Sequence, residues 1–196
     1  MSPKIGLRRL KRFQAGPQGF TLIELVVTMA ILGVVAAFAI PNFSKWKEKH
    51  QINAQAQKIY FDLMLARTTA VKSNNNVRVI FNTTAHSYQI HEDSDGDGTI
   101  DTGENVKNGA LENNVQFAYN TGITDTDGND VTSAVTFGGT LVFDSKGQAS
   151  SSGSVLLLHE NDIGETDERA RLISILQATG AVDYWEYSAS ESPPWK

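Results

Sequence analysis

The sequence predicts an α+β fold in which a long N-terminal helix, transmembrane over its first half, packs on a C-terminal antiparallel β domain. An apolar run extends from Phe20 to Ile40 and is long enough to cross a bilayer. After Pro41, apolar residues recur at steps of three or four, which is the spacing of one face of a helix. From Val77 the apolar period changes to two, which indicates strands with one buried face. A chain of 196 residues suits one membrane anchor and one globular domain.

The apolar run fits a membrane span better than a secretory signal. Its 21 residues, at about 1.5 Å each, cover roughly the 30 Å of a hydrocarbon core. The run is long for the apolar part of a signal peptide, and its end, Ala39–Asn42, is a weak cleavage site. The residues before it carry five positive charges and no acid, which predicts a cytoplasmic N-terminus. These charges belong to Lys4, Arg8, Arg9, Lys11 and Arg12.

One carboxylate, Glu24, interrupts the apolar run near its start. An acid within a membrane span costs roughly 2.5–3.5 kcal/mol on insertion scales and therefore indicates a function and a partner. The nearest candidate cation is an α-amino group at Phe20, which exists only if the chain is cut after Gly19.

The segment Gly19-Phe20-Thr21-Leu22-Ile23-Glu24-Leu25 resembles the class III signal of type IV pilins and pseudopilins. The resemblance implies that a prepilin peptidase cuts between Gly19 and Phe20 and that Phe20 becomes the N-methylated terminus. It also implies that Glu24 neutralises the terminal amine of a neighbouring subunit during filament assembly. Pro41 and Asn42 match the same family, in which a proline near this point kinks the long helix.

The second half of the helix is expected to be amphipathic and to end near Ser73–Asn76, a turn-forming polar cluster. We expect a sheet to pack on its apolar stripe, which consists of Ile52, Ala56, Ile59, Leu63, Ala66 and Ala70, widened by Tyr60, Met64 and Val71. The opposite surface is expected to carry Lys45, Lys47, Glu48, Lys49, Gln51, Gln55 and Lys58. Strands are expected at 77–81, 88–92, 111–119, 134–137, 140–143, 154–159, 171–177 and 181–187.

The order of these features is similar to that of the GspH/FimT group, the minor pseudopilins of type II secretion and minor type IV pilins. The similarity rests on an Asp/Gly-rich loop after the first hairpin, on Phe143-Asp144-Ser145-Lys146-Gly147, and on two final strands divided by Thr179-Gly180. It implies a type IV pilin-like fold with four parts. They are a leader (1–19), a transmembrane and assembly helix (20–41), the amphipathic half of that helix (42–73) and a periplasmic β domain (74–196).

The loop 93–104 matches the EF-hand calcium pattern at every ligand position. Calcium would be held by the carboxylates of Asp93, Asp95, Asp97, Asp101 and Glu104 and by the carbonyl of Thr99, with Gly98 at the sharp turn. The flanking segments read as a strand and as non-helical chain, so a turn between strands without metal is the alternative. A second cluster, Asp125–Asp130, lacks the closing Glu and is expected to be a turn.

Composition and motifs exclude several other classes of function. The chain has no cysteine, so thiolate metal sites and cysteine nucleophiles are excluded. After Gly19 it carries 12 basic and 22 acidic residues, which argues against nucleic-acid binding. No hydrolase or phosphate-binding motif is present, and His50, His86, His91 and His159 lack metal-ligand spacing, so we expect no enzyme.

Three functions remain open. The first is a minor pseudopilin of a type II secretion pseudopilus, anchored in the inner membrane by one span with its C-terminal domain in the periplasm. The second is a FimT-like minor pilin that serves pilus biogenesis, motility or DNA uptake; the tail Tyr187–Lys196 is not basic, which argues against DNA. The third is a membrane-tethered calcium-binding module. The expected partners are other pilin-like subunits, the prepilin peptidase and the inner membrane.

Overall fold

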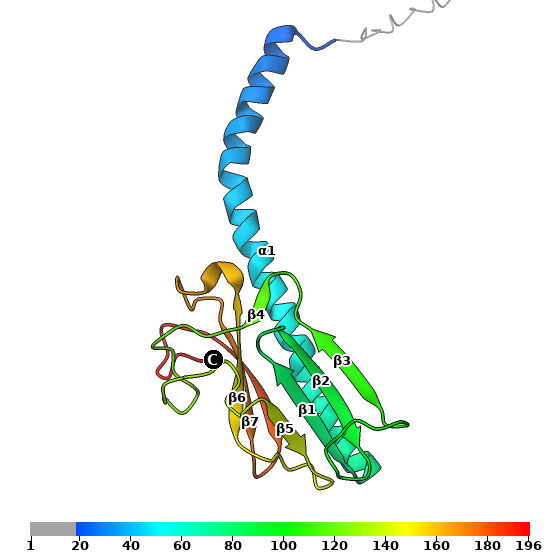
Figure 1. Ribbon diagram of the computed structural model, residues 1–196. Helices are drawn as coiled ribbons and strands as arrows, with labels where there is room; N and C mark the ends of the chain where they lie inside the picture. Colours follow the sequence, from blue (N-terminus) through cyan, green and yellow to red (C-terminus); the bar gives the residue numbers. More distant parts are fainter. Residues whose placement is uncertain (1–18) are drawn as a thin grey trace, which may run out of the picture. The chain divides into compact units, whose positions relative to one another are not determined.

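The computed structural model describes residues 19–196, except for the side chains of Pro41 and Asn42. One helix, α1 (Leu22–Ser73), precedes eight strands and a short 3₁₀ turn, η1 (Glu160–Asp162) (Figure 1). The chain divides into two compact units, of which the first ends at Ser44 and the second comprises Lys45–Lys196. The expected leader lies almost wholly outside the described residues and stays a prediction.

In the first unit, α1 presents apolar side chains on all sides. An 18-residue window has a mean hydropathy of 2.5, and none of it is buried within the structure. By length and composition this segment can cross a membrane, and its full exposure distinguishes it from the core helix of a globular domain. The helix assignment continues through Pro41, so a kink at that position stays a prediction.

In the second unit, α1 buries the apolar stripe that its spacing predicts. The six stripe residues, Ile52, Ala56, Ile59, Leu63, Ala66 and Ala70, are each at most 1% exposed. Two of the residues expected to widen it, Met64 and Val71, are instead exposed, because they lie at the margin of the face that the sheets cover. Gln55, expected on the outer surface, is buried. The helix ends at Ser73 as predicted, and Asn74 takes a left-handed conformation (φ 58°) that stops it.

Two four-stranded antiparallel sheets follow the helix. The first has the order β3-β2-β1-β5 and consists of Val106–Ala110, Ser87–Asp93, Asn76–Asn82 and Thr140–Phe143. The second has the order β4-β6-β7-β8 and consists of Val115–Phe117, Gly153–His159, Arg171–Leu176 and Ala181–Glu186. In Figure 1 the lower half of α1 lies alongside β1, β2 and β3.

The strand predictions fail at three places. The expected strand 111–119 shrinks to β4, because Asn113 and Asn114 turn the chain with φ near 60° (59° and 61°). The segment 134–137 forms only a single bridge, between Val135 and Val155. Strand β3 was not expected, because four of its five residues are exposed and leave no apolar alternation to read.

The hydrophobic core has two parts, and the second sheet lies between them. The main cluster joins the α1 stripe to one face of each sheet. A second cluster covers the opposite face of β6 and β7, and Trp195 from the C-terminal tail closes it by donating from Nε1 to the carbonyl of Thr124 (2.7 Å). Strand β6 is therefore buried on both faces, which explains its continuous run of apolar residues from Val155 to Leu158.

Candidate assembly and metal sites

Glu24 lies in the first turn of α1 and is exposed, like the apolar residues around it. Its backbone N–H donates to the hydroxyl of Thr21 (3.2 Å), so Thr21 caps the helix and Glu24 occupies the acidic position of a capping box. Among the described residues no ion pair neutralises the Glu24 carboxylate. The chain therefore offers an unneutralised acid at the start of a helix fit to span a membrane.

The Asp-rich loop begins at the end of β2 and brings three of its predicted ligands together. Carboxylate oxygens of Asp93, Asp95 and Asp97 lie within 4.8 Å of one another. Asp93 is buried, whereas Asp95 and Asp97 are exposed. Oxygen ligands at this separation suit a hard divalent cation such as calcium.

Two partners from the protein already hold Asp93. Arg78 on β1 donates from Nε to Asp93 Oδ2 (2.6 Å), and the N–H of Gly98 donates to Oδ1 (3.3 Å). Burial opposes ionisation of Asp93, but these donors outweigh burial and lower the pKa of the carboxyl below its ordinary value of 3.8. Gly98, at φ +80°, lies so close to Arg78 that an added Cβ would be 2.7 Å from the guanidinium. The loop thus folds back over Arg78.

Glu104, expected to close the calcium site, is engaged elsewhere. It contacts Nε2 of the buried His91 and accepts from the backbone N–H groups of Ser94 (2.8 Å) and Asp101 (3.1 Å). The bond from His91, followed by that from the Asp101 N–H, lowers the pKa of Glu104 to about 2. Glu104 is therefore not part of the group formed by the three aspartates.

The other predicted ligands stay on the loop surface. Thr99 donates to Asp97 Oδ1 from both its N–H and its hydroxyl, each at 2.7 Å. Asp101 is exposed, and its pKa is raised above 3.8, mainly by the charge of Asp97 and further by Asp95 and Glu104. These like charges would be relieved by a bound cation.

Arg78 and His91 contact predicted calcium ligands of the loop, and the sequence did not signal these contacts. They are direct partners in the β1–β2 register, and the loop covers both. Nothing in the sequence indicates a cation under the loop, because the register of the hairpin is needed to place it. They contact the first and last predicted calcium ligands, Asp93 and Glu104, so these two carboxylates already have partners within the protein.

The second acidic cluster forms a turn, as predicted. Asp125 Oδ1 accepts from the N–H groups of Asp127 and Asn129, each at 2.9 Å. This geometry is an Asx-type turn, and Gly128 provides its left-handed position (φ 84°).

Polar side chains of α1, among them Asp62 and Arg67, fasten the helix to the sheets. Asp62 is buried in the helix face and binds the Tyr88 hydroxyl (2.6 Å) and the Lys107 ammonium (2.5 Å). Arg67 donates to the carbonyls of Gly147 (3.0 Å) and Thr179 (2.8 Å), which joins the turns of the two sheets. Gly180 packs against this junction, because a Cβ there would lie 2.0 Å from the Gly147 oxygen.

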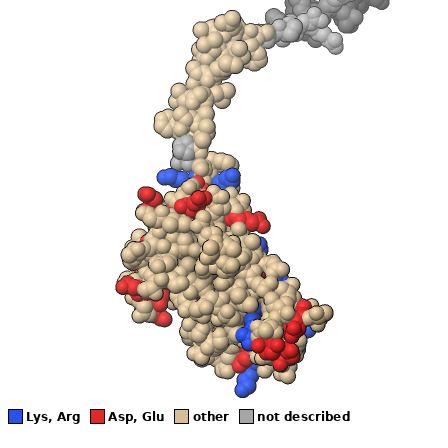
Figure 2. Space-filling model, viewed as in Figure 1, with Lys and Arg blue, Asp and Glu red and all other residues tan. Residues whose placement is uncertain are grey.

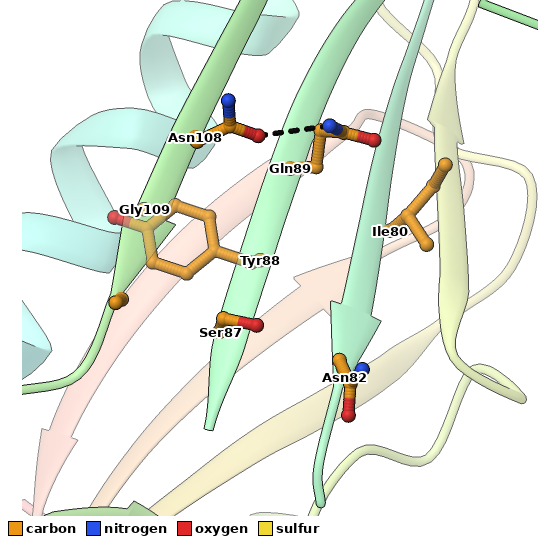
Figure 3. A pocket seen from close by; sticks show the side chains of 8 residues that line it. Ile80, Asn82, Ser87, Tyr88, Gln89, Asn108 and Gly109 are labelled. Atoms are coloured by element: carbon orange, nitrogen blue, oxygen red, sulfur yellow. Dashed lines mark hydrogen bonds between the residues drawn. The ribbon is translucent and has the colours of Figure 1, made fainter. Parts of the chain in front are cut away.

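The outer face of the first sheet carries a shallow hollow of about 450 Å³ (Figure 3). Its polar lining is uncharged and includes Asn82, Ser87, Gln89 and Asn108, and Gln89 donates to Asn108 across β2 and β3 (2.8 Å). The lining of the hollow thus carries hydroxyl and amide groups and no charged side chain.

Comparisons with known proteins match the N-terminal part of the chain and the globular unit separately. The prokaryotic N-terminal methylation motif matches residues 16–40. The type IV major pilin protein PilA of Myxococcus xanthus is 51% identical over 41 residues, 21% of this chain and 19% of that protein. The type II secretion system core protein G of Klebsiella pneumoniae is 45% identical over 47 residues, 24% of this chain and 31% of that protein. The matched stretches thus span about a fifth to a third of these curated relatives.

Two solved structures resemble this chain at low sequence identity. The minor pseudopilin EpsH of the type II secretion system of Vibrio cholerae has a TM-score of 0.45 and 16% identity, covering 69% of this chain and 97% of that one. The type IV minor pilin FimU of Pseudomonas aeruginosa has a TM-score of 0.48 and 15% identity, covering 74% and 95%.

A family model extends the match across most of the globular unit. The model of the type II transport protein GspH matches residues 55–179, which is more than half of the chain. That segment contains the helix stripe from Ala56 onward, strands β1 to β7 and the Asp-rich loop. The chain belongs to the GspH family of type II transport proteins.

Proposed function

We propose that the protein is a structural minor pseudopilin of a type II secretion pseudopilus and takes part in protein secretion across the outer membrane. The observation that carries the proposal is the lone Glu24 at the start of an exposed apolar helix, in a chain of the GspH family. The chain has a structural role and is itself the substrate of a prepilin peptidase. It rests in the inner membrane with the β domain in the periplasm.

The proposed assembly step is charge neutralisation. Cleavage after Gly19 releases an α-amino group at Phe20, and Glu24 of an adjacent subunit pairs with it. An unpaired carboxylate costs roughly 2.5–3.5 kcal/mol within a membrane helix, so a pairing cation favours the assembled subunit over one resting alone. Two charges at about 4 Å attract strongly where water is excluded.

We further propose that calcium binds the loop 93–104. Asp93, Asp95 and Asp97 provide the convergent oxygens, and the raised pKa of Asp101 is a sign of repulsion that a cation would relieve. For a full set of ligands, Glu104 must give up its contacts with His91 and Ser94 and bind the metal instead. Calcium would then fasten the loop over Arg78 and His91.

Deletion of the gene in its host, with complementation, tests the cellular role. The proposal predicts loss of secreted enzymes from the medium with surface pili and motility unchanged. Loss of pili or of DNA uptake with normal secretion would instead support a FimT-like minor pilin, because the matched N-terminal stretch is common to pilins and pseudopilins.

Calorimetry on the detergent-solubilised full chain tests the metal. We expect calcium to bind with a dissociation constant in the millimolar range or below, and we expect Asp97→Ala to abolish the binding heat. Asp127→Ala, in the second acidic turn, is the matched control and should bind as the unchanged chain does. Absence of calcium heat at millimolar metal, or equal heat from the Asp97→Ala chain, would refute the metal site.

A further inference from the structure

A cleft at the start of the globular unit lies next in sequence to the proposed membrane span. Its volume is about 450 Å³, and its walls come from α1 and from the loop 160–169 after β6. Lys45, Trp46 and Lys49 line it from the helix. Lys45 is only five residues beyond Ile40, the last residue of the apolar run. The cleft therefore includes the residues of the globular unit that are nearest in sequence to the proposed membrane span, and lipid headgroups extend about 5–8 Å beyond the hydrocarbon on each side.

Both walls of the cleft are fixed by one guanidinium. Arg169 donates from Nη1 to Glu48 Oε2 on α1 (2.6 Å) and from Nε to the buried Asp162 (2.8 Å to Oδ2). Asn161 adds a bond from Nδ2 to Glu48 Oε1 (3.0 Å). Arg169 carries one positive charge against the two carboxylates of Asp162 and Glu48, so this cluster keeps a net charge of −1 while its groups bond to one another.

The charges left for a ligand are two ammonium groups and one carboxylate. Lys45 and Lys49 are exposed, and they take part in none of the ion pairs formed by the described residues. They are four residues apart, so both lie on the same face of the helix. Glu168 lines the opposite wall and is exposed. In Figure 2, Lys and Arg side chains and Asp and Glu side chains lie near one another at both ends of the globular unit.

Trp46, 62% exposed and also lining the cleft, adds an amphipathic ring. Tryptophan and lysine that follow a membrane span are the residues that settle among headgroups, because the apolar parts of their side chains face the hydrocarbon and the polar tips reach water. The acids on the loop make a ligand with only negative charge a poor match. A ligand with one phosphate and one primary ammonium complements both walls.

We propose that this cleft binds the headgroup of an aminophospholipid, phosphatidylethanolamine, in the outer half of the inner membrane. The phosphate binds the ammonium groups of Lys45 and Lys49, and the ethanolamine ammonium donates to the carboxylate of Glu168. A choline headgroup cannot make the last contact, because a quaternary ammonium has no N–H to donate. The proposal rests on the membrane span of the proposed function. It adds a lipid ligand that would hold the unassembled subunit at the bilayer surface.

The test reconstitutes the full chain in phosphatidylcholine nanodiscs that contain equal minor amounts of phosphatidylethanolamine and phosphatidylglycerol. Native mass spectrometry then counts the lipids retained on the released protein. We expect phosphatidylethanolamine to be retained preferentially, and K45Q/K49Q to reduce its retention by roughly tenfold or more, since each lysine near a phosphate contributes about 1 kcal/mol. E168Q should abolish the preference for phosphatidylethanolamine over phosphatidylglycerol.

K47Q is the matched control, because Lys47 is exposed on the same turn but does not line the cleft. It should retain lipid as the unchanged chain does. Equal retention of all three lipids, or an equal loss from K47Q, would overturn the proposal. So would equally strong binding of soluble O-phosphoethanolamine to the detergent-solubilised chain, since that would make the ligand a free metabolite. A chain that fails to enter any nanodisc refutes the membrane span itself, which is a separate result.

Discussion

Tyr88 crosses the face of its strand partner Gly109 and donates its hydroxyl to Asp62 on α1, with an O–O distance of 2.6 Å. The Tyr88 ring fills the space that a Cβ at position 109 would need, so only glycine fits there (Figure 3). Burial, and next the bond to Asp62, raise the pKa of Tyr88, so the hydroxyl stays protonated and remains a donor. One aromatic residue thus joins β2, β3 and the long helix.

Gly109→Ala should destabilise the globular unit. A methyl group at this position would lie 2.2 Å from the Tyr88 ring and would force the ring off Asp62. We expect a loss of about 1–3 kcal/mol, the usual cost of overpacking. Thermal unfolding of the solubilised chain, followed by near-UV circular dichroism, measures it. The exposed neighbour Asn108→Ala is the control, and an equal loss from both variants would contradict the role of the close contact.

Leu63→Ala and Phe61→Ala separate the two faces of α1. Leu63 is 1% exposed in the main core and Phe61 is 62% exposed. Removal of the Leu63 side chain leaves a cavity and should cost about 2–5 kcal/mol. Removal of the Phe61 side chain should change stability by no more than about 0.5 kcal/mol. Urea unfolding midpoints compare the two, and a larger effect at Phe61 would mean that the helix is rotated relative to the sheets.

The helix and most strands could be predicted from the sequence because their signals are local. The stripe from Ile52 to Ala70 and the alternation from Val77 reflect which face each residue turns to the core. Strand β3 has no such signal, since it is an exposed edge held by its pairing with β2 and by the Lys107 contact to Asp62. Pairing between strands that are distant in the sequence leaves no periodic pattern of apolar residues in the sequence itself.

The same limit applies to the candidate sites. The positions of Glu24 and of the aspartates are visible as spacing along the chain. Arg78 and His91 become relevant only when the β1–β2 register places them side by side under the loop. Glu48 and Arg169 are 121 residues apart, so the cleft that they shape cannot be read from either segment alone.

Acid should open the Asp-rich loop. The pKa of Glu104 falls from an ordinary 4.5 to about 2 in the folded chain. Because its pKa is lower in the folded chain, the ionised Glu104 carboxylate stabilises the loop fully above about pH 4.5. This stabilisation is lost as the pH falls towards 2 and the carboxylate is protonated. The protection factors of the Ser94 and Asp101 amides, which donate to Glu104, should therefore fall across this window in the presence of a chelator. Glu104→Gln should show fast exchange at neutral pH already, and protection that is independent of pH would contradict the contact.

Glu24→Ala tests the central proposal most directly. In the host, the variant should be processed at Gly19 and retained in the inner membrane, as mass spectrometry of the mature N-terminus and membrane fractionation would show. It should be absent from the assembled pseudopilus fraction, and secretion should fall to the level of the deletion. Thr28→Ala is the matched control, because Thr28 is an exposed polar residue on the same helix whose hydroxyl donates to the Leu25 carbonyl one turn back (2.9 Å). Incorporation of the Glu24→Ala chain at the level of the Thr28→Ala control would contradict the assembly role of Glu24.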